Sequence, residues 1–171
     1  QTCALPISKR VLSLSNGVIG VLNAAAVSIH AIGQGLATAT GNEPKHAIKQ
    51  VDRLLSNDGI DVWRLSQLWV PFVLAERKEI VVTLDWTEFD KDDQSTIALH
   101  LVTSHGRTTP LVWQTVRKSE LAGRRAQYED EVIERFHAIV PEDVDVTVMA
   151  DRGFGDQLRY QHLEVLGWDY I

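Results

Sequence analysis

The spacing of apolar side chains changes at Ile80, and this change constrains the fold more than any other feature of the sequence. Residues 18–75 have the apolar pattern of successive helices, although three glycines within residues 20–35 disfavour helix. The run Ile80–Asp85 is instead short, rich in β-branched residues and closed by a carboxylate, which is typical of a central strand. We therefore predict a helical N-terminal region at residues 8–79 and an α/β domain at residues 80–171.

Beyond the first strand, the sequence predicts an alternation of strands and helices. Two further strands, at residues 96–102 and 109–116, follow polar turns and complete an antiparallel meander. A long polar helix over residues 119–140 leads to a fourth strand at residues 144–150, and after another helix a fifth strand begins at Trp168. Because crossover connections are right-handed, the fourth strand should lie parallel to the first and beside it.

Two aspartates mark the ends of the first and fourth strands. Asp85 closes the first strand, and Asp151 follows the fourth at a glycine-containing turn before a helix. Their backbones should lie roughly 5 Å apart, and two carboxylates that close cannot both ionise cheaply without a cation. Mg²⁺ or Mn²⁺ suits such oxygen ligands, whereas an aspartate at a strand end can also act only as a cap. The spacing alone is compatible with a metal-binding pair, although a structural role is the more common one for an aspartate at a strand end.

Charge is distributed unevenly along the chain, whose formal net charge is −6. Residues 1–79 hold eight Lys and Arg against six Asp and Glu, whereas residues 80–171 hold nine against seventeen. The acidic half repels nucleic-acid phosphates unless its carboxylates bind cations. On a helix in the first half, Lys45, Lys49 and Arg53 lie outside the apolar stripe, which suits either a solvated face or contacts to DNA phosphates.

Targeting and redox features are sparse. The longest low-charge run, residues 11–40, contains polar residues and four glycines, so we expect a cytoplasmic protein that does not enter a membrane. Cys3 is the only cysteine, which excludes an internal disulfide or zinc-ribbon site. Residues 1–7 resemble the translated end of a sequencing adapter, and we expect them to be a cloning or assembly scar.

Four segments resemble the motifs of a known family. Residues 84–90 (LDWTEFD), 105–113 (HGRTTPLVW) and 150–156 (ADRGFGD) resemble the successive core motifs of DDE transposases of bacterial insertion sequences, in the insertion-sequence-four group. Residues 46–57 (HAIKQVDRLLSN) are similar to the N-terminal helical motif of that group. The resemblance covers nearly everything after residue 7, and it implies a ribonuclease H-like catalytic core that is incomplete at its C-terminus.

The resemblance also implies roles for individual residues. Asp85 and Asp151 correspond to the first and second metal-binding catalytic aspartates, and the complete site of the family holds two Mg²⁺ or Mn²⁺ ions. The third ligand of the family is a glutamate in a later motif of Tyr, Arg, Glu and Lys, which we expect beyond Ile171. Arg152 either contacts a DNA phosphate or pairs with a neighbouring acid.

The function that the resemblance implies is DNA transposition. A complete transposase of this kind binds terminal inverted repeats and target DNA as a homodimer, at the nucleoid in the prokaryotic cytoplasm. It cuts and joins DNA by metal-dependent attack of water and then of a 3′ hydroxyl. The main alternative is a catalytically inactive remnant that at most binds DNA or a full-length relative. A ribonuclease H-like nuclease unrelated to transposition is a third interpretation.

Overall fold

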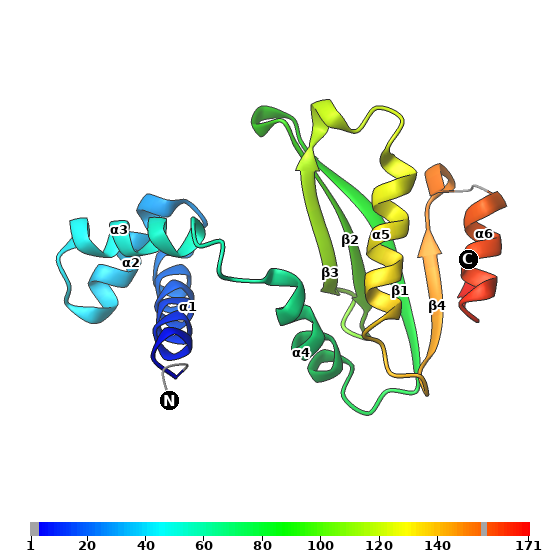
Figure 1. Ribbon diagram of the computed structural model, residues 1–171, viewed down its shortest axis with the longest axis horizontal. Coiled ribbons are helices and arrows are strands. Elements are labelled where there is room, and N and C mark those ends of the chain that lie inside the picture. The colour runs from blue at the N-terminus through cyan, green and yellow to red at the C-terminus, as the bar shows by residue number, and fades with distance from the viewer. Residues whose placement is uncertain (1–3, 155–156) are drawn as a thin grey trace. The chain divides into compact units, whose positions relative to one another are not determined.

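The computed structural model describes residues 4–154 and 157–171, and the chain divides after Asp61 into two compact units (Figure 1). The first unit is helical, and the second combines a sheet with helices. Helix α4 (Val62–Leu74) belongs to the second unit because its Val70 and Leu74 are fully buried in the core of the sheet. The expected boundary at residues 79 and 80 therefore marks the start of the first strand, whereas the units separate one helix earlier.

The first unit contains α1 (Ala4–Ala24), α2 (Ile29–Thr40) and α3 (Pro44–Leu55). Gly41 ends α2 with a φ of +71°, whereas the glycines inside α1 and α2 lie where helices meet. A Cβ atom built on Gly35 of α2 would stand 2.5 Å from the carbonyl oxygen of Gly20 in α1. No side chain fits in that space, so glycine permits a backbone contact that compensates for its low helix propensity.

This close approach predicts opposite effects for two glycine substitutions. Gly35→Ala should lower the free energy of unfolding by about 1–3 kcal/mol, because the new methyl group meets backbone atoms of Gly20 and Ala24. Gly17→Ala is the matched control, since its Cβ would meet only the flexible end of Leu54 and the change raises helix propensity. Thermal unfolding followed by circular dichroism compares the two variants with the parent chain, and equal midpoints would contradict the backbone contact.

Strands and helices alternate in the second unit. After α4 come β1 (Glu79–Phe89), η1 (Asp90–Asp92), β2 (Gln94–Val102), β3 (Thr108–Arg117), η2 (Lys118–Glu120), α5 (Arg125–His137), β4 (Asp145–Ala150), η3 (Arg152–Phe154), α6 (Gln157–Val165) and β5 (Asp169–Tyr170). The strands form one sheet in the order β3-β2-β1-β4-β5. β2 is antiparallel to both β1 and β3, whereas β4 is parallel to β1 and to β5. The predicted meander and the parallel fourth strand beside the first are confirmed.

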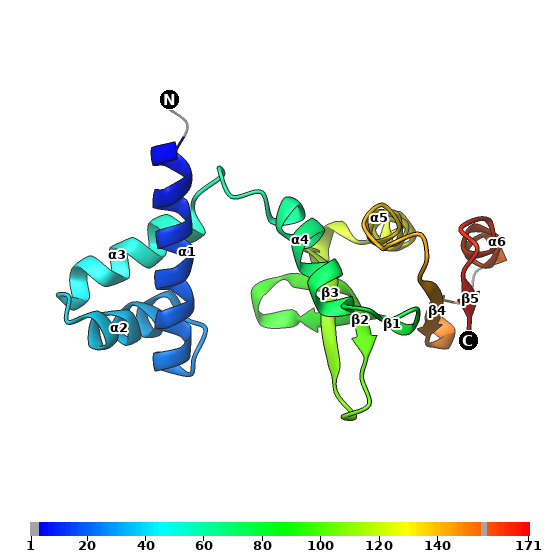
Figure 2. The same cartoon turned by 90° about the horizontal axis from the view of Figure 1, so that it is seen from below.

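Helices α4, α5 and α6 cover the same face of this five-stranded mixed sheet (Figure 2). Their buried apolar side chains pack on alternate residues of the strands, including Val82 and Leu84 of β1. The opposite face carries the other set of alternating residues, among them the exposed Trp113 and Met149. Asp85, which follows Leu84 in β1, belongs to this uncovered face.

Two of the differences from the predicted element boundaries bear on the position of Asp85 and on the start of α5. β1 continues to Phe89 instead of ending at Asp85, because its pairing with β2 extends to the pair Phe89 and Gln94. α5 begins at Arg125 rather than at residue 119, because the chain first makes the short η2 turn and Gly123 then adopts a φ of +71°. Asp85 is therefore an interior residue of β1, held by pairing with Ala98 of β2.

Within residues 4–154 and 157–171, no single helix has the length and apolar composition needed to cross a membrane. The segments Lys9–Ala24 and Ile29–Thr40 reach that length and composition only together, and they are bent by 96° relative to each other.

Candidate functional site

The register between β1 and β4 brings the two predicted aspartates to equivalent positions. The last parallel pair joins Leu84 to Ala150, and Asp85 and Asp151 are the next residues on the two strands. Neighbouring strands lie about 4.8 Å apart, so the two backbones are close enough for both carboxylates to reach a common ligand. Both aspartates are exposed to solvent.

The turn after β4 fixes the carboxylate of Asp151. The backbone N–H of Gly153 donates to Asp151 Oδ1 at 2.7 Å, and the N–H of Phe154 donates to the Asp151 carbonyl oxygen at 3.1 Å. Such a bond from an aspartate side chain to the backbone two residues on stabilises a turn. Asp151 therefore has the structural role that the sequence left open, and its second oxygen, Oδ2, is left to bind a further group.

Asp151 also lines a pocket of about 190 Å³ on the helix-covered side of the sheet. Leu84, Phe154, Arg159 and Leu163 contribute to the same pocket, whereas Asp85 does not. The backbones of the two aspartates are thus brought together, but their side chains do not line one cavity. For both carboxylates to bind one ion, Asp151 has to turn toward the uncovered face on which Asp85 lies.

His100 of β2 is a titratable neighbour of Asp85, and no sequence motif points to it. It pairs with Thr83, two residues before Asp85, and lies on the same uncovered face. Partial burial lowers the pKa of His100 below the usual imidazole value, and the negative charge of Asp85 opposes this effect without cancelling it. The ring is therefore neutral at pH 7, with a lone pair on one nitrogen.

A buried ion pair connects the segments that carry the two aspartates. Glu129 of α5 accepts a hydrogen bond from the Trp86 indole N–H at 2.7 Å, next to Asp85 in β1. Its other carboxylate oxygen pairs with the guanidinium group of Arg159 in α6, the helix after the Asp151 turn. The Glu129 and Arg159 side chains are only 9% and 6% exposed, so solvent screens their attraction weakly.

Sequence reasoning missed this pair because a carboxylate on a polar helix is usually solvated. One signal was present. Glu129 stands three and four residues before Val132 and Ile133, which belong to the apolar stripe of that helix in the sequence. A carboxylate in such a position has to find a buried partner, and Arg159 is that partner.

Three of the acids near Asp85 in sequence, Glu88, Asp90 and Asp93, are paired with basic or hydroxyl groups. Lys118 Nζ lies 2.5 Å from Glu88 Oε2 and also pairs with Asp90, while Arg125 reaches the other oxygen of Glu88. These contacts lower the pKa of Glu88, first through the hydrogen bond from Lys118 and then through that from Arg125. Asp93 accepts hydrogen bonds from the hydroxyl and the backbone N–H of Ser119.

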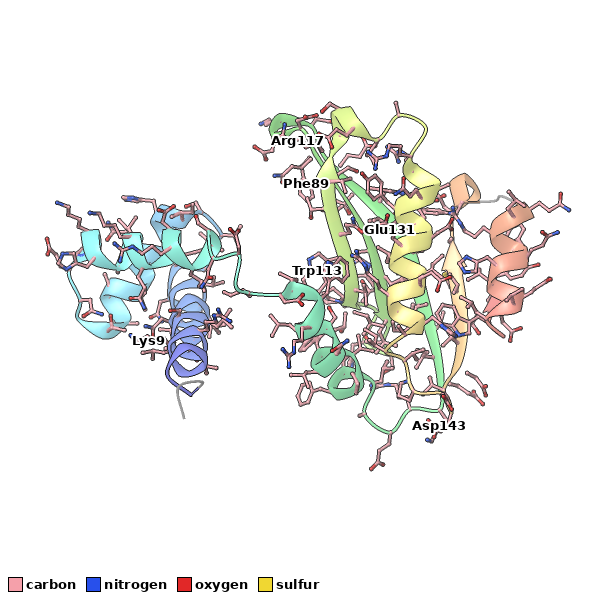
Figure 3. All side chains as sticks on the ribbon, in the orientation of Figure 1. Lys9, Phe89, Trp113, Arg117, Glu131 and Asp143 are labelled. Carbon is pink, nitrogen blue, oxygen red and sulfur yellow. The ribbon has the colours of Figure 1, made fainter. Side chains whose placement is uncertain are left out.

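These pairs tie the end of the meander, near Phe89 and Arg117, to the start of α5 (Figure 3). Asp143 lies toward the opposite end of the sheet, where it pairs with Lys78. These contacts give Glu88, Asp90 and Asp93 structural roles. Asp85 and Asp151, where the β1–β4 pairing ends, have no basic partner among the described residues.

The donor set fits a loosely held divalent ion better than a closed metal site. In the part of the chain that the structure describes, no three His, Cys, Asp or Glu side chains are grouped closely enough to hold a metal ion. Mg²⁺ commonly binds through one or two carboxylates and completes its shell with water and substrate phosphates. Asp85 and Asp151 could supply such a pair.

The basic residues predicted to contact DNA fall in two places. Lys45, Lys49 and Arg53 are exposed along α3 at intervals of four residues, so they share one side of that helix. None of the three makes an ion pair with another described residue. Arg152 begins η3, but its side chain lies outside what the structure describes, and neither a phosphate contact nor an acidic partner can be assigned to it.

Comparison of the chain with known protein families, with curated proteins and with solved structures found no match. The fold and the geometry described above therefore carry the functional interpretation together with the motif resemblance.

The buried ion pair makes a prediction about stability. Glu129→Gln leaves Arg159 charged and poorly paired in the interior, so it should lower the free energy of unfolding by about 3–5 kcal/mol. Glu134→Gln on the same helix removes only the exposed contact to His162 and should cost about 0–1 kcal/mol. Urea unfolding measures both values. A double variant, Glu129→Leu with Arg159→Leu, should be more stable than either single change, and a simply additive loss would contradict the coupling.

The proximity of Asp85 to His100 makes a prediction about protonation. An NMR titration should give His100 a pKa below the usual imidazole value, and Asp85→Asn should lower this pKa further because a nearby negative charge is lost. Asp143→Asn removes the same charge at the other end of the sheet and should leave the His100 titration unchanged. A rise of the His100 pKa in Asp85→Asn would mean that the two groups do not interact as described.

Proposed function

We propose that this chain is the N-terminal part of an insertion-sequence transposase, and that its function is metal-dependent DNA transposition. The observation that carries the proposal is the parallel register of β1 and β4, which sets Asp85 and Asp151 at equivalent positions of adjacent strands. Carboxylates at the ends of parallel strands are a common site of chemistry in α/β sheets.

The sheet order supports the assignment of a ribonuclease H-like core. An antiparallel meander extended by two parallel strands, β3-β2-β1-β4-β5, is the arrangement that the resemblance implies for such a core. The helical first unit agrees with the N-terminal helical motif of the same family, since α3 spans most of residues 46–57.

The two aspartates would bind Mg²⁺ or Mn²⁺ through their carboxylate oxygens. An ion bound there would activate an attacking water or 3′ hydroxyl and stabilise the leaving oxygen of a phosphodiester. Asp85 is held in position by its backbone pairing in β1, whereas Asp151 would have to rotate about its own Cα–Cβ bond and give up the hydrogen bond from the Gly153 N–H. Rotation of an exposed side chain takes picoseconds to nanoseconds, and binding of the ion would have to compensate for the lost hydrogen bond.

The resemblance adds a third carboxylate from a later glutamate motif, a second ion, and a homodimer bound to the inverted repeats and the target DNA. Two aspartates without that glutamate would bind an ion only weakly, so cleavage should require the third carboxylate. The alternative function is that of a catalytically inactive remnant, which keeps the DNA contact of α3 but has lost metal-dependent chemistry. Metal binding at the aspartate pair separates the two.

Titration with Mn²⁺, followed by electron paramagnetic resonance, tests the metal pair. Asp151→Asn should weaken Mn²⁺ binding by at least roughly tenfold, the loss that even a change outside the ligand shell typically causes. Asp145→Asn is the matched control, because Asp145 is an exposed acid at the other end of the same strand. Equal Mn²⁺ affinity in the parent and in Asp151→Asn would remove the pair and leave the inactive remnant as the better interpretation.

A further inference from the structure

A second polar pocket lies in the helical unit, between α1 and α3. Its volume is about 420 Å³, and its polar lining consists of Ser13 from α1, His46, Gln50 and Arg53 from α3, and Asn57 just after α3. Positions 46, 50, 53 and 57 follow one another at intervals of four, three and four residues, so they form a single stripe that faces α1.

The lining offers hydrogen-bond donors and no carboxylate. Arg53 brings a guanidinium fork, Gln50 and Asn57 bring amide groups, and Ser13 brings a hydroxyl. Asn57 Oδ1 already accepts a hydrogen bond from the Gly59 N–H at 3.0 Å, which leaves both hydrogens of the Asn57 amide available. Within the described residues, the side chains of Ser13, Gln50 and Arg53 make no hydrogen bond or ion pair.

A second arginine stands at the rim of this pocket. A Cβ atom built on Gly59 would lie 2.7 Å from Nη2 of Arg10 and 3.1 Å from Oδ1 of Asn57, which places the Arg10 guanidinium beside the pocket-lining amide. Glu43 lies 3.6 Å from the His46 ring, and Asp52 and Asp58 adjoin Arg53 and Asn57 in the chain, but none of these acids lines the pocket. The lining itself is therefore positively charged through Arg53, although the unit as a whole is almost neutral.

We propose that this pocket binds a phosphate group, and that the phosphate belongs to the backbone of DNA. A guanidinium fork binds two oxygens of a phosphate at once, and amide and hydroxyl donors can contact the remaining oxygens. Contacts of this kind position DNA without reading its sequence. The DNA source rests on the proposed function, whereas the phosphate chemistry follows from the donors alone.

Arg53 differs from Lys45 and Lys49, which the sequence predicts as DNA contacts together with it, because only Arg53 lines the pocket. Lys45 and Lys49 share a side of α3 with Arg53, but they do not line the pocket. They add positive charge in solvent, which attracts DNA over a distance of about a Debye length. Arg53 belongs to both stripes, and it is the residue that holds the phosphate.

Binding of inorganic phosphate to the complete chain, followed by NMR chemical shifts, tests the pocket. Arg53→Gln should weaken phosphate binding roughly tenfold, and Ser13→Ala on the other helix should weaken it by roughly threefold. Lys45→Gln removes the same charge from the same helix outside the pocket and should change the affinity by less than about twofold. Equal effects of Arg53→Gln and Lys45→Gln, or shifts away from the pocket, would overturn the site.

A duplex DNA of arbitrary sequence identifies the source of the phosphate. If the pocket holds a DNA phosphate, Arg53→Gln should reduce the slope of log affinity against log salt by about one, and inorganic phosphate should compete with DNA. Phosphate binding without either effect would overturn the DNA assignment and identify free phosphate as the ligand. Asp151→Asn should leave phosphate binding unchanged, so failure of the metal site and failure of this pocket are distinguishable.

Discussion

β1 pairs with β4 from Glu79 to Leu84 and with β2 from Val82 to Phe89, so from Asp85 onward it is paired with β2 and no longer with β4. On the β2 side, the backbone of Asp85 is fixed by ladder hydrogen bonds. On the β4 side, the partner strand has ended and the turn at Asp151 has begun. A ligand-binding carboxylate needs a rigid backbone that fixes its position and an uncovered side from which the ligand can reach it, and Asp85 has both. The candidate site depends on this offset between the two pairings.

Glu129 holds the surroundings of that offset in place. Burying a carboxylate and a guanidinium costs several kcal/mol for each ion, and hydrophobic residues of similar volume often stabilise a fold as well or better. Apolar residues, however, do not make directional hydrogen bonds that fix how one element is oriented relative to another. The Trp86 indole and the Arg159 guanidinium each meet a different oxygen of Glu129, which fixes the orientation of α5 relative to β1 and α6 together. The same contacts orient the strand and the turn that carry the two aspartates.

The order of elements could be predicted because it depends on local periodicity and on the handedness of crossovers, both of which can be read from the chain. What failed depends on distant partners. β1 extends beyond its predicted end because β2 continues to pair with it. The packing of α4 on the sheet could not be predicted, because a helical pattern does not indicate which hydrophobic core the helix will join. The Asp85 and Asp151 positions follow from strand order, whereas the Glu129 pair depends on side chains brought together from three elements. The α1 contribution to the basic pocket was missed for the same reason.

The division of the chain after Asp61 also divides its charge. Residues 1–61 hold five Lys and Arg against four Asp and Glu, and residues 62–171 hold twelve against nineteen, so the units carry +1 and −7. By itself, the acidic unit would repel the phosphodiester that is proposed to be cut at its aspartate pair. The helical unit is proposed to bind a DNA phosphate, and the acidic unit is covalently linked to it. Once the helical unit has bound DNA, the contact between the acidic unit and that DNA becomes intramolecular, with an effective DNA concentration in the mM range for a short linker. In the proposed transposase, the helical unit would then bind DNA and the acidic unit would carry the catalytic aspartates. The acidic unit would need no affinity for DNA of its own.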